Sequence, residues 1–220
     1  MNIPHLRIDF HTHTIASKDS LTRPEDFIRT CRRKGLDRVV VTDHNSIHGA
    51  LAVQALDPER IIVGEEIMTD RGEILASFVT EEVPRGLTPQ ETIRRLRDQG
   101  AFISVSHPFD SYRNGAWKPD DLLEIAPFVD AIEIFNARCL LAGDNDKALE
   151  FARLHNLPGT AGSDGHAASE LGAAHLVLPQ FDGPDGLRQV IRQGRVEGGL
   201  SPFWVHFFSR YARLRKKVGV

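Results

Sequence analysis

Histidines and carboxylates gather directly after several short apolar runs of the sequence. Such runs are typical of buried strands, and the carboxyl ends of parallel strands meet on one face of a barrel. The residues concerned are His11, His13, His44, Glu66, His107, Asp164 and His166. Imidazole and carboxylate ligands suit Zn, Mn or Fe(II) better than Mg or Ca. Their number exceeds what one tetrahedral ion uses, so we predict at least two divalent ions with a bridging carboxylate.

Each motif taken alone also has a structural explanation. His11 and His13 could be polar residues at a strand end, residues 42–45 a simple turn, and His107 a histidine held before Pro108. Together they place five of the ten histidines at expected strand ends, which favours a joint metal site. For the other five we expect structural roles: His5, His48, His155, His175 and His206.

The order of segments predicts a parallel sheet covered by helices. Strands are expected at Leu6–Phe10, Arg38–Thr42, Arg60–Glu66, Ala101–Ser106, Ala131–Phe135, Pro158–Ala161 and His175–Leu178, with a possible addition at Ile74–Val79. About seven βα units favour a barrel over two separate domains. An open doubly wound sheet is the alternative, but the sequence contains no GxGxxG or GxxxxGK loop.

The expected helix ends are marked by local signals. Thr22 and Thr88 each stand three residues before a glutamate, with a proline between them, so both hydroxyls are predicted to cap a helix. Gly35 and Gly100 stand where a helix should end and a strand begin.

The composition is that of an ordinary globular protein, with 220 residues, 41% hydrophobic and 26% charged. No signal-peptide or membrane-spanning segment is recognisable, so we expect a cytoplasmic protein. We expect no disulfide framework from Cys31 and Cys139. The net charge is −3. Residues 201–220 have a charge of +5, so the rest of the chain has a charge of −8. An acidic body argues against a broad nucleic-acid-binding surface.

The sequence resembles the PHP (polymerase and histidinol phosphatase) domain phosphoesterases over roughly residues 6–178. The residues that carry the resemblance are His11-Thr-His13 with Ser17, Asp19 and Leu21, Thr42–Asn45 with Gly49, Gly64–Glu66, Ser106–Pro108, Glu133–Asn136 and Gly162–His166. The resemblance implies an α/β fold, a distorted (β/α)7 TIM-like barrel, with a bi- or trinuclear metal centre at the carboxyl ends of the strands.

The resemblance also implies which residues bind each ion. His11, His13, Glu66 and Asp164 resemble the ligands of one ion, with Glu66 bridging. Asp19, His44 and His166 resemble the ligands of a second.

A third ion, where present, would be reached by His107. Many relatives have a histidine a few residues after the bridging glutamate, and this chain offers Glu73 there instead. Strand alternation should turn Glu65 away from the site.

We expect Asp43, His107 and Asp164 to take part in catalysis, Asp43 by orienting a ligand or accepting a proton. Asn136 and Arg138 are expected to bind substrate, with Arg138 holding a phosphate or lying free in solvent. Arg113 and Lys118 are weaker candidates for the same task. No GxSxG motif suggests a protein nucleophile, so a metal-activated water is the expected attacking group.

We expect residues 1–200 to form the barrel domain and residues 201–220 a basic aromatic helix that is not an independent domain. Residues 201–218 place Trp204, Phe207, Phe208, Tyr211, Leu214 and Val218 at helical spacing, and their charges are all basic. This helix could pack on its own barrel, join a second subunit in a homo-oligomer, lie on an anionic membrane surface or contact RNA.

These observations predict a metal-dependent phosphoesterase acting on a small phosphorylated compound, a nucleotide or a short oligonucleotide. The cofactors would be two or three divalent ions, zinc, manganese or iron. A histidinol-phosphate-type or phosphotyrosine phosphatase is the alternative within the same chemistry. From other classes, an amidohydrolase-like C–N or C–O hydrolase and a non-catalytic metal sensor remain open.

Overall fold

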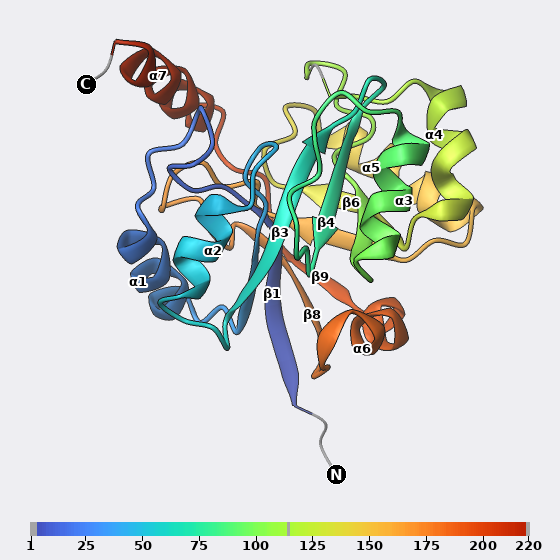
Figure 1. Ribbon diagram of the computed structural model, residues 1–220, viewed down its shortest axis with the longest axis horizontal. Coiled ribbons are helices and arrows are strands. Elements are labelled where there is room, and N and C mark those ends of the chain that lie inside the picture. The colour runs from blue at the N-terminus through green and yellow to red at the C-terminus, as the bar shows by residue number, and fades with distance from the viewer. Residues whose placement is uncertain (1–3, 114, 219–220) are drawn as a thin grey trace.

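The strands form one sheet that curls into a nearly closed barrel (Figure 1). The computed structural model describes residues 4–113 and 115–218. Within them the strands are β1 (His5–Thr12), β2 (Arg38–Val41), β3 (Ile61–Met68), β4 (Glu73–Ser77), β5 (Phe102–Val105), β6 (Ala131–Asn136), β7 (Gly159–Gly162), β8 (Ala174–Pro179) and β9 (Arg195–Gly198). Their order in the sheet is β7-β6-β5-β4-β3-β2-β1-β8-β9.

The barrel closes where β7 meets β1. Thr12 and Gly165 form a parallel bridge, and the amide of Asp164 donates to the carbonyl of His11 at 2.7 Å. Glycine is required at position 162 because an added Cβ would overlap the Cβ of His11. This close approach brings the ends of the first and seventh strands together.

The predicted barrel is confirmed, but its repeat is less regular than (β/α)7. β4 is antiparallel to both β3 and β5, and only residues 69–72 connect it to β3. Four residues suffice for a hairpin, whereas a parallel crossover needs about a dozen. β8 runs antiparallel to β1 and extends the sheet beyond the ring with β9, a strand that the sequence did not reveal.

Helices cover the outside of the sheet on several sides (Figure 1). They are α1 (Pro24–Lys34), α2 (His48–Gln54), α3 (Pro89–Asp98), α4 (Pro119–Ile125), α5 (Ala142–Leu154), α6 (Gly183–Val190) and α7 (Val205–Lys217), with short 3₁₀ turns at Ala126–Phe128 and Ile191–Gln193. Among the residues that the structure describes, no helix is long and apolar enough to cross a bilayer.

Three of the four helix-end signals behave as predicted. Thr88 caps α3 by accepting the amide of Glu91, and Gly35 and Gly100 adopt left-handed conformations after α1 and α3. The expected cap at Thr22 is wrong. Arg23 occupies the N-cap position, and the Thr22 hydroxyl donates to the carbonyl of His166 at 3.3 Å. Thr22 lies one residue too early to reach the helix amides.

The apolar side chains form two clusters on opposite faces of the sheet. Val39 and Val41 belong to the larger cluster, which lies under the surrounding helices. Val40 points the other way, into a cluster that includes Leu187 of α6 and Ile191. The alternation follows from the two-residue period of a strand.

The last helix, α7, packs on the barrel through small residues. Val205, Ser209 and Ala212 are buried, and the large side chains face outward. The exposed set is Phe203, Trp204, Phe207, Phe208, Tyr211, Leu214 and Val218. The expectation that this aromatic stripe packs on the chain's own barrel is therefore wrong. Contacts with a second subunit, a membrane or RNA stay predictions, as does the division into a barrel domain of residues 1–200 and a dependent tail.

Candidate metal centre

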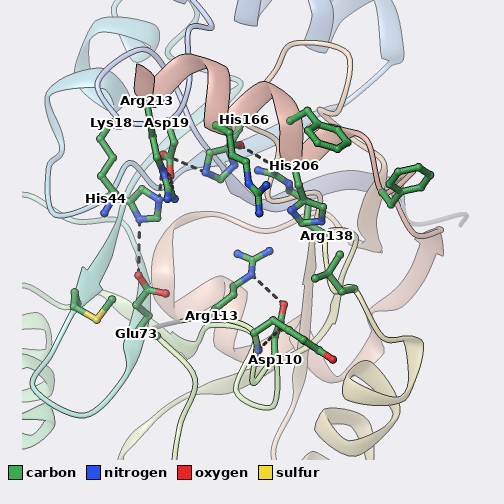
Figure 2. Close-up of a pocket in the computed structure, with 18 residues that line it drawn as sticks. Lys18, Asp19, His44, Glu73, Asp110, Arg113, Arg138, His166, His206 and Arg213 are labelled. Atoms are coloured by element: carbon green, nitrogen blue, oxygen red, sulfur yellow. Dashed lines mark hydrogen bonds and ion pairs between the residues drawn. The ribbon is translucent and has the colours of Figure 1, made fainter. Parts of the chain in front are cut away.

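The predicted ligands converge at one end of the barrel, where the parallel strands end and where the antiparallel β4 begins at Glu73. His11 lies in β1, Glu66 in β3 and Glu73 in β4, and the others lie in the loops that follow β1, β2, β5 and β7. Three groups each offer ligand atoms within 4.8 Å of one another: His11, His13 and Glu66; His13, His44 and His166; and His44, Glu66 and Glu73. Figure 2 shows the open side of this cluster.

The first group matches the first expected ion site. His11 Nε2 lies 3.3 Å from Glu66 Oε1, and His13 Nε2 lies 3.5 Å from Glu66 Oε2. Asp164 Oδ1 completes the group at 3.6 Å from His11 Nε2 and 3.2 Å from His13 Nε2. One cation between these atoms would meet two imidazoles and two carboxylates, a donor set suited to a transition metal.

The second group, His13, His44 and His166, lies beside the first, and Asp19 contacts its last two members. Asp19 Oδ1 lies 3.3 Å from His166 Nε2 and 3.5 Å from His44 Nε2. His44 also reaches Glu66, with Nδ1 2.9 Å from Oε2, so Glu66 contacts both groups as a bridging ligand should. Asp164 and His166 are linked by a short turn in which Asp164 has a left-handed backbone conformation. In this turn His166 Nδ1 contacts the Asp164 carbonyl oxygen at 2.8 Å.

The third group contains Glu73, the residue that replaces the expected histidine. His107 Nε2 lies 3.2 Å from Glu66 Oε1 and 3.5 Å from Glu73 Oε2. Glu73 is buried in β4, and a side chain at Gly115 would overlap its carboxylate. The geometry therefore brings Glu73 and His107 to one place, next to the bridging glutamate.

Unpartnered buried atoms test whether this donor set fits metal ions. Several ligand atoms are shielded from solvent and make no hydrogen bond within the part of the chain that the structure describes: His11 Nε2, His13 Nε2, Asp19 Oδ1, Glu66 Oε2 and Asp164 Oδ1. Leaving such atoms buried without a partner is costly. All five lie among the ligands expected for the first two ions, so the residues present fit divalent ions.

The electrostatics point the same way. Burial alone would raise the pKa of Glu66, but His11 and His44 hold that pKa well below its usual value. Burial opposes protonation of His11 and His44, yet the surrounding carboxylates raise the pKa of both. Burial, followed by His13 and Arg138, lowers the pKa of His166 to about 3, which leaves its imidazole neutral as metal binding requires. The cluster therefore attracts positive charge.

Buried hydrogen bonds orient the two histidines of β1 and the following loop. His11 Nδ1 lies 2.9 Å from Glu133 Oε1, so its Nε2 is directed toward Glu66. His13 Nδ1 contacts Ser17 Oγ at 3.0 Å, and that hydroxyl donates to Asp43 Oδ1 at 2.5 Å.

Asp43 also accepts the Thr14 amide at 2.7 Å, so its carboxylate is occupied by the loop. Of its two expected roles, this position suits orientation of a ligand.

The two expected substrate-binding residues lie beneath or beside the cavity. The Asn136 amide donates to Asp164 Oδ2 at 3.1 Å and to Glu133 Oε2 at 3.2 Å, which places it under the ligands. Arg138 is buried rather than free in solvent. Its Nε lies 3.2 Å from Glu170 Oε2, and it lines the cavity.

Arg113 is the cation that projects into the cavity (Figure 2). Its guanidinium pairs with Asp164 and, through Nε, with Asp110 at 3.0 Å. Its side chain keeps 22% of its exposure, so donors remain available to a ligand. Lys118 lies outside the set of described residues that line the cavity.

Sequence reasoning missed the contribution of the C-terminal helix. The cavity has a volume of about 470 Å³, and α7 supplies His206, Phe207, Arg210 and Arg213 to its wall. His206 had been given only a structural role. Arg213 donates to Asp19 at 2.7 Å from 194 residues away, a contact for which the sequence holds no local signal.

Comparisons with known proteins match most of the chain. The sequence profile of the PHP domain matches residues 9–97, and that of the PHP-associated segment matches residues 142–196. An uncharacterized protein of Methanocaldococcus jannaschii is 34% identical over 187 residues, covering 83% of this chain and 75% of the relative. A second uncharacterized protein of that organism is 32% identical over 145 residues, covering 60% of this chain and 82% of its own.

A solved structure shows a similar fold. It is a two-domain protein from Bacteroides vulgatus, described as containing a predicted PHP-like metal-dependent phosphoesterase. The TM-score is 0.72 at 21% identity, covering 90% of this chain and 66% of that one. At that identity the likeness concerns the fold, and the chain spans about two thirds of the length of that protein.

Proposed function

The chain belongs to the PHP domain family, and from this premise we propose that it is a metal-dependent phosphoesterase acting on a small phosphorylated compound, a nucleotide or a short oligonucleotide. The observation that carries the proposal is a set of buried histidine and carboxylate atoms that lack hydrogen-bond partners among the described residues. One of these residues, Asp19, lines a cavity whose wall also holds Lys18 and four arginines. A volume of about 470 Å³ is that of a small-ligand site, which favours a small molecule or a short chain end over a protein surface.

We assign two or three divalent ions to this centre, with zinc, manganese or iron as the candidates. His11, His13, Glu66 and Asp164 would hold one, and Asp19, His44 and His166 a second. His107 and Glu73 would serve a third. When bound, the ions would supply a water of lowered pKa and would neutralise charge on the phosphoryl oxygens.

The chain's own residues would bind and orient the phosphoryl group. Arg113 is the best placed, since its guanidinium projects into the cavity beside Asp164 and retains exposed donors. A planar guanidinium can hold two phosphoryl oxygens at once. Arg138 is already engaged with Glu170 and with Ser209 of α7, so we assign it to the cavity wall.

The three proposed catalytic residues contact different parts of the centre. Asp164 lies between the ion site and Arg113 and so aligns both with the phosphoryl group. His107 Nε2, between Glu66 and Glu73, can hold a proton or a ligand at the edge of the centre. Asp43 acts through Ser17 on His13.

The test compares phosphate release by metal-free and reconstituted protein. Chelator-treated protein is supplied with Zn, Mn or Fe and offered a panel of phosphomonoesters, phosphodiesters, nucleotides and short oligonucleotides. We expect turnover only with added metal, and loss of turnover in Asp164→Ala and His166→Ala. Glu59→Gln, on the exposed surface, is the control.

Other outcomes would contradict the proposal. Metal binding without turnover of any substrate would favour the sensor. Release of an amine or alcohol from a carbonyl compound, with no phosphate produced, would favour the amidohydrolase-like alternative.

A further inference from the structure

We propose that Arg213 of α7 is a positioning residue for the metal centre. It holds one oxygen of Asp19 so that the other faces His44 and His166, and it thereby couples metal binding to docking of the C-terminal helix. The inference rests on the metal site proposed above, and it adds a structural role for a helix that lies outside both matched family segments.

The two oxygens of Asp19 have separate surroundings. Oδ2 accepts from Arg213 Nε at 3.1 Å and from Nη2 at 2.7 Å. Oδ1 lies 3.5 Å from His44 Nε2 and 3.3 Å from His166 Nε2, and among the residues that the structure describes it has no hydrogen-bond partner. Two of the three guanidinium nitrogens, Nε and Nη2, donate to Oδ2, so Oδ1 remains available as a ligand.

The exposure of the two side chains explains why this contact matters. The Asp19 side chain is 1% exposed, whereas that of Arg213 is 54% exposed and lies at the rim of the cavity (Figure 2). An aspartate carboxylate turns readily about its last torsion, and two donors on one oxygen restrict that rotation. Without Arg213, either oxygen could face solvent, and the ion site would lose a fixed ligand.

Further contacts tie α7 to the loop that carries Asp19. Lys216 donates to the carbonyls of Ile15 and Ser17 in that loop. On the opposite side, Arg138 donates to Ser209 Oγ at 2.9 Å. The helix therefore bridges the loop after β1 and the loop after β6, and Asp19 keeps its position only while the helix is docked.

Thermodynamic linkage makes this coupling reciprocal. If docking of α7 favours the ion held by Asp19, then binding of that ion must favour docking of α7 by the same factor. The effect on metal affinity expected for removal of such an orienting partner is about 10- to 100-fold. Both directions can be measured without an enzyme assay.

The experiment measures metal affinity and hydrogen exchange in matched variants of the full chain. Metal-free wild type, Arg213→Ala, Arg213→Lys and Lys217→Ala are titrated with Zn or Mn by calorimetry. Lys217 is an exposed cation on the same helix, so its variant controls for charge. We expect Arg213→Ala to lose about 10- to 100-fold in affinity for one ion, Arg213→Lys to recover part of the loss, and Lys217→Ala to match the wild type.

Exchange of the amides of residues 205–217 supplies the reciprocal measurement. Metal should slow their exchange in the wild type and in Lys217→Ala, and much less in Arg213→Ala. Equal affinities in wild type and Arg213→Ala, or exchange in α7 that ignores metal, would overturn the inference. If Arg213→Ala does not fold, two other results together would overturn the inference. Arg213→Lys would bind metal as tightly as the wild type, and amide exchange in α7 of the wild type would not change with metal.

A different result would contradict the proposed function. A wild type that binds no divalent ion contradicts the metal centre itself and the inference with it. If the wild type binds its ions and Arg213→Ala binds them equally well, the role of Arg213 is contradicted but the metal centre is not.

Discussion

Replacing Glu133 with glutamine should weaken metal binding although no proposed ligand is changed. One oxygen of Glu133 accepts His11 Nδ1 at 2.9 Å, and the other accepts the His107 amide at 2.7 Å and the Asn136 side chain at 3.2 Å. All three are donors. A glutamine offers one acceptor, so its NH₂ group must face either His11 or the two donors on the other side.

The smaller disturbance is for the NH₂ group to face His11. His11 Nδ1 must then become the acceptor, which moves the proton to Nε2, the atom that faces Glu66. A protonated Nε2 cannot bind a cation. Loss of a histidine's orienting partner typically costs about 10- to 100-fold in metal affinity, which equals about 1.4 to 2.7 kcal/mol.

Calorimetric titration of metal-free Glu133→Gln with Zn or Mn measures this loss. Glu59→Gln makes the same chemical change on the exposed surface and should bind like the wild type. Thermal unfolding in chelator shows whether the variant is folded before metal is added. A folded Glu133→Gln variant with wild-type affinity would refute the argument that Glu133 fixes the proton of His11.

Two further variants test buried contacts. Burial raises the pKa of Glu65 from 4.5 to about 8. One carboxylate oxygen accepts the Val83 amide, and the other has no hydrogen-bond partner among the described residues. Between pH 4.5 and pH 8 the folded state therefore keeps a proton that the unfolded state has released. The free energy of unfolding of the wild type should fall as the pH rises through that range. Measured by urea unfolding, the stability of Glu65→Gln relative to the wild type should increase by up to about 4 kcal/mol from pH 5 to pH 8. A stability difference that does not change with pH would contradict this prediction. In Gly49→Ala, the added methyl group would overlap Asp43 Oδ2 and Thr14 Oγ1. Urea unfolding should therefore show a free energy of unfolding lower by about 1 to 3 kcal/mol than that of the wild type. Unchanged stability would mean that the loop moves aside without cost, contrary to this prediction.

The sequence was sufficient to predict the barrel and the convergence of its polar strand ends. Runs such as residues 38–42 and 101–106 are apolar and bounded by turn signals, so their periodicity is readable locally. The predicted turn of Glu65 away from the site also holds, because Glu65 accepts the Val83 amide while Glu66 meets the histidines. These features depend on neighbours a few residues apart.

Features that depend on distant contacts were not predictable in this way. The four-residue strand Arg195–Gly198 is half polar, and it is held by pairing with the distant β8 and by Val196, which packs on the second apolar cluster. The aromatic stripe of α7 indicated an apolar docking face, yet the helix is held by the small Ser209 and by the cations Arg213 and Lys216. Polar contacts of this kind leave no periodic trace in the sequence.

The central claim is that this cluster binds divalent ions in the assigned positions. Anomalous scattering from crystals of the full chain grown with Zn or Mn tests it most directly. We expect one anomalous peak among His11, His13, Glu66 and Asp164 and a second among Asp19, His44 and His166. Saturating metal with no peak at either position, or with peaks only elsewhere on the protein, would contradict it.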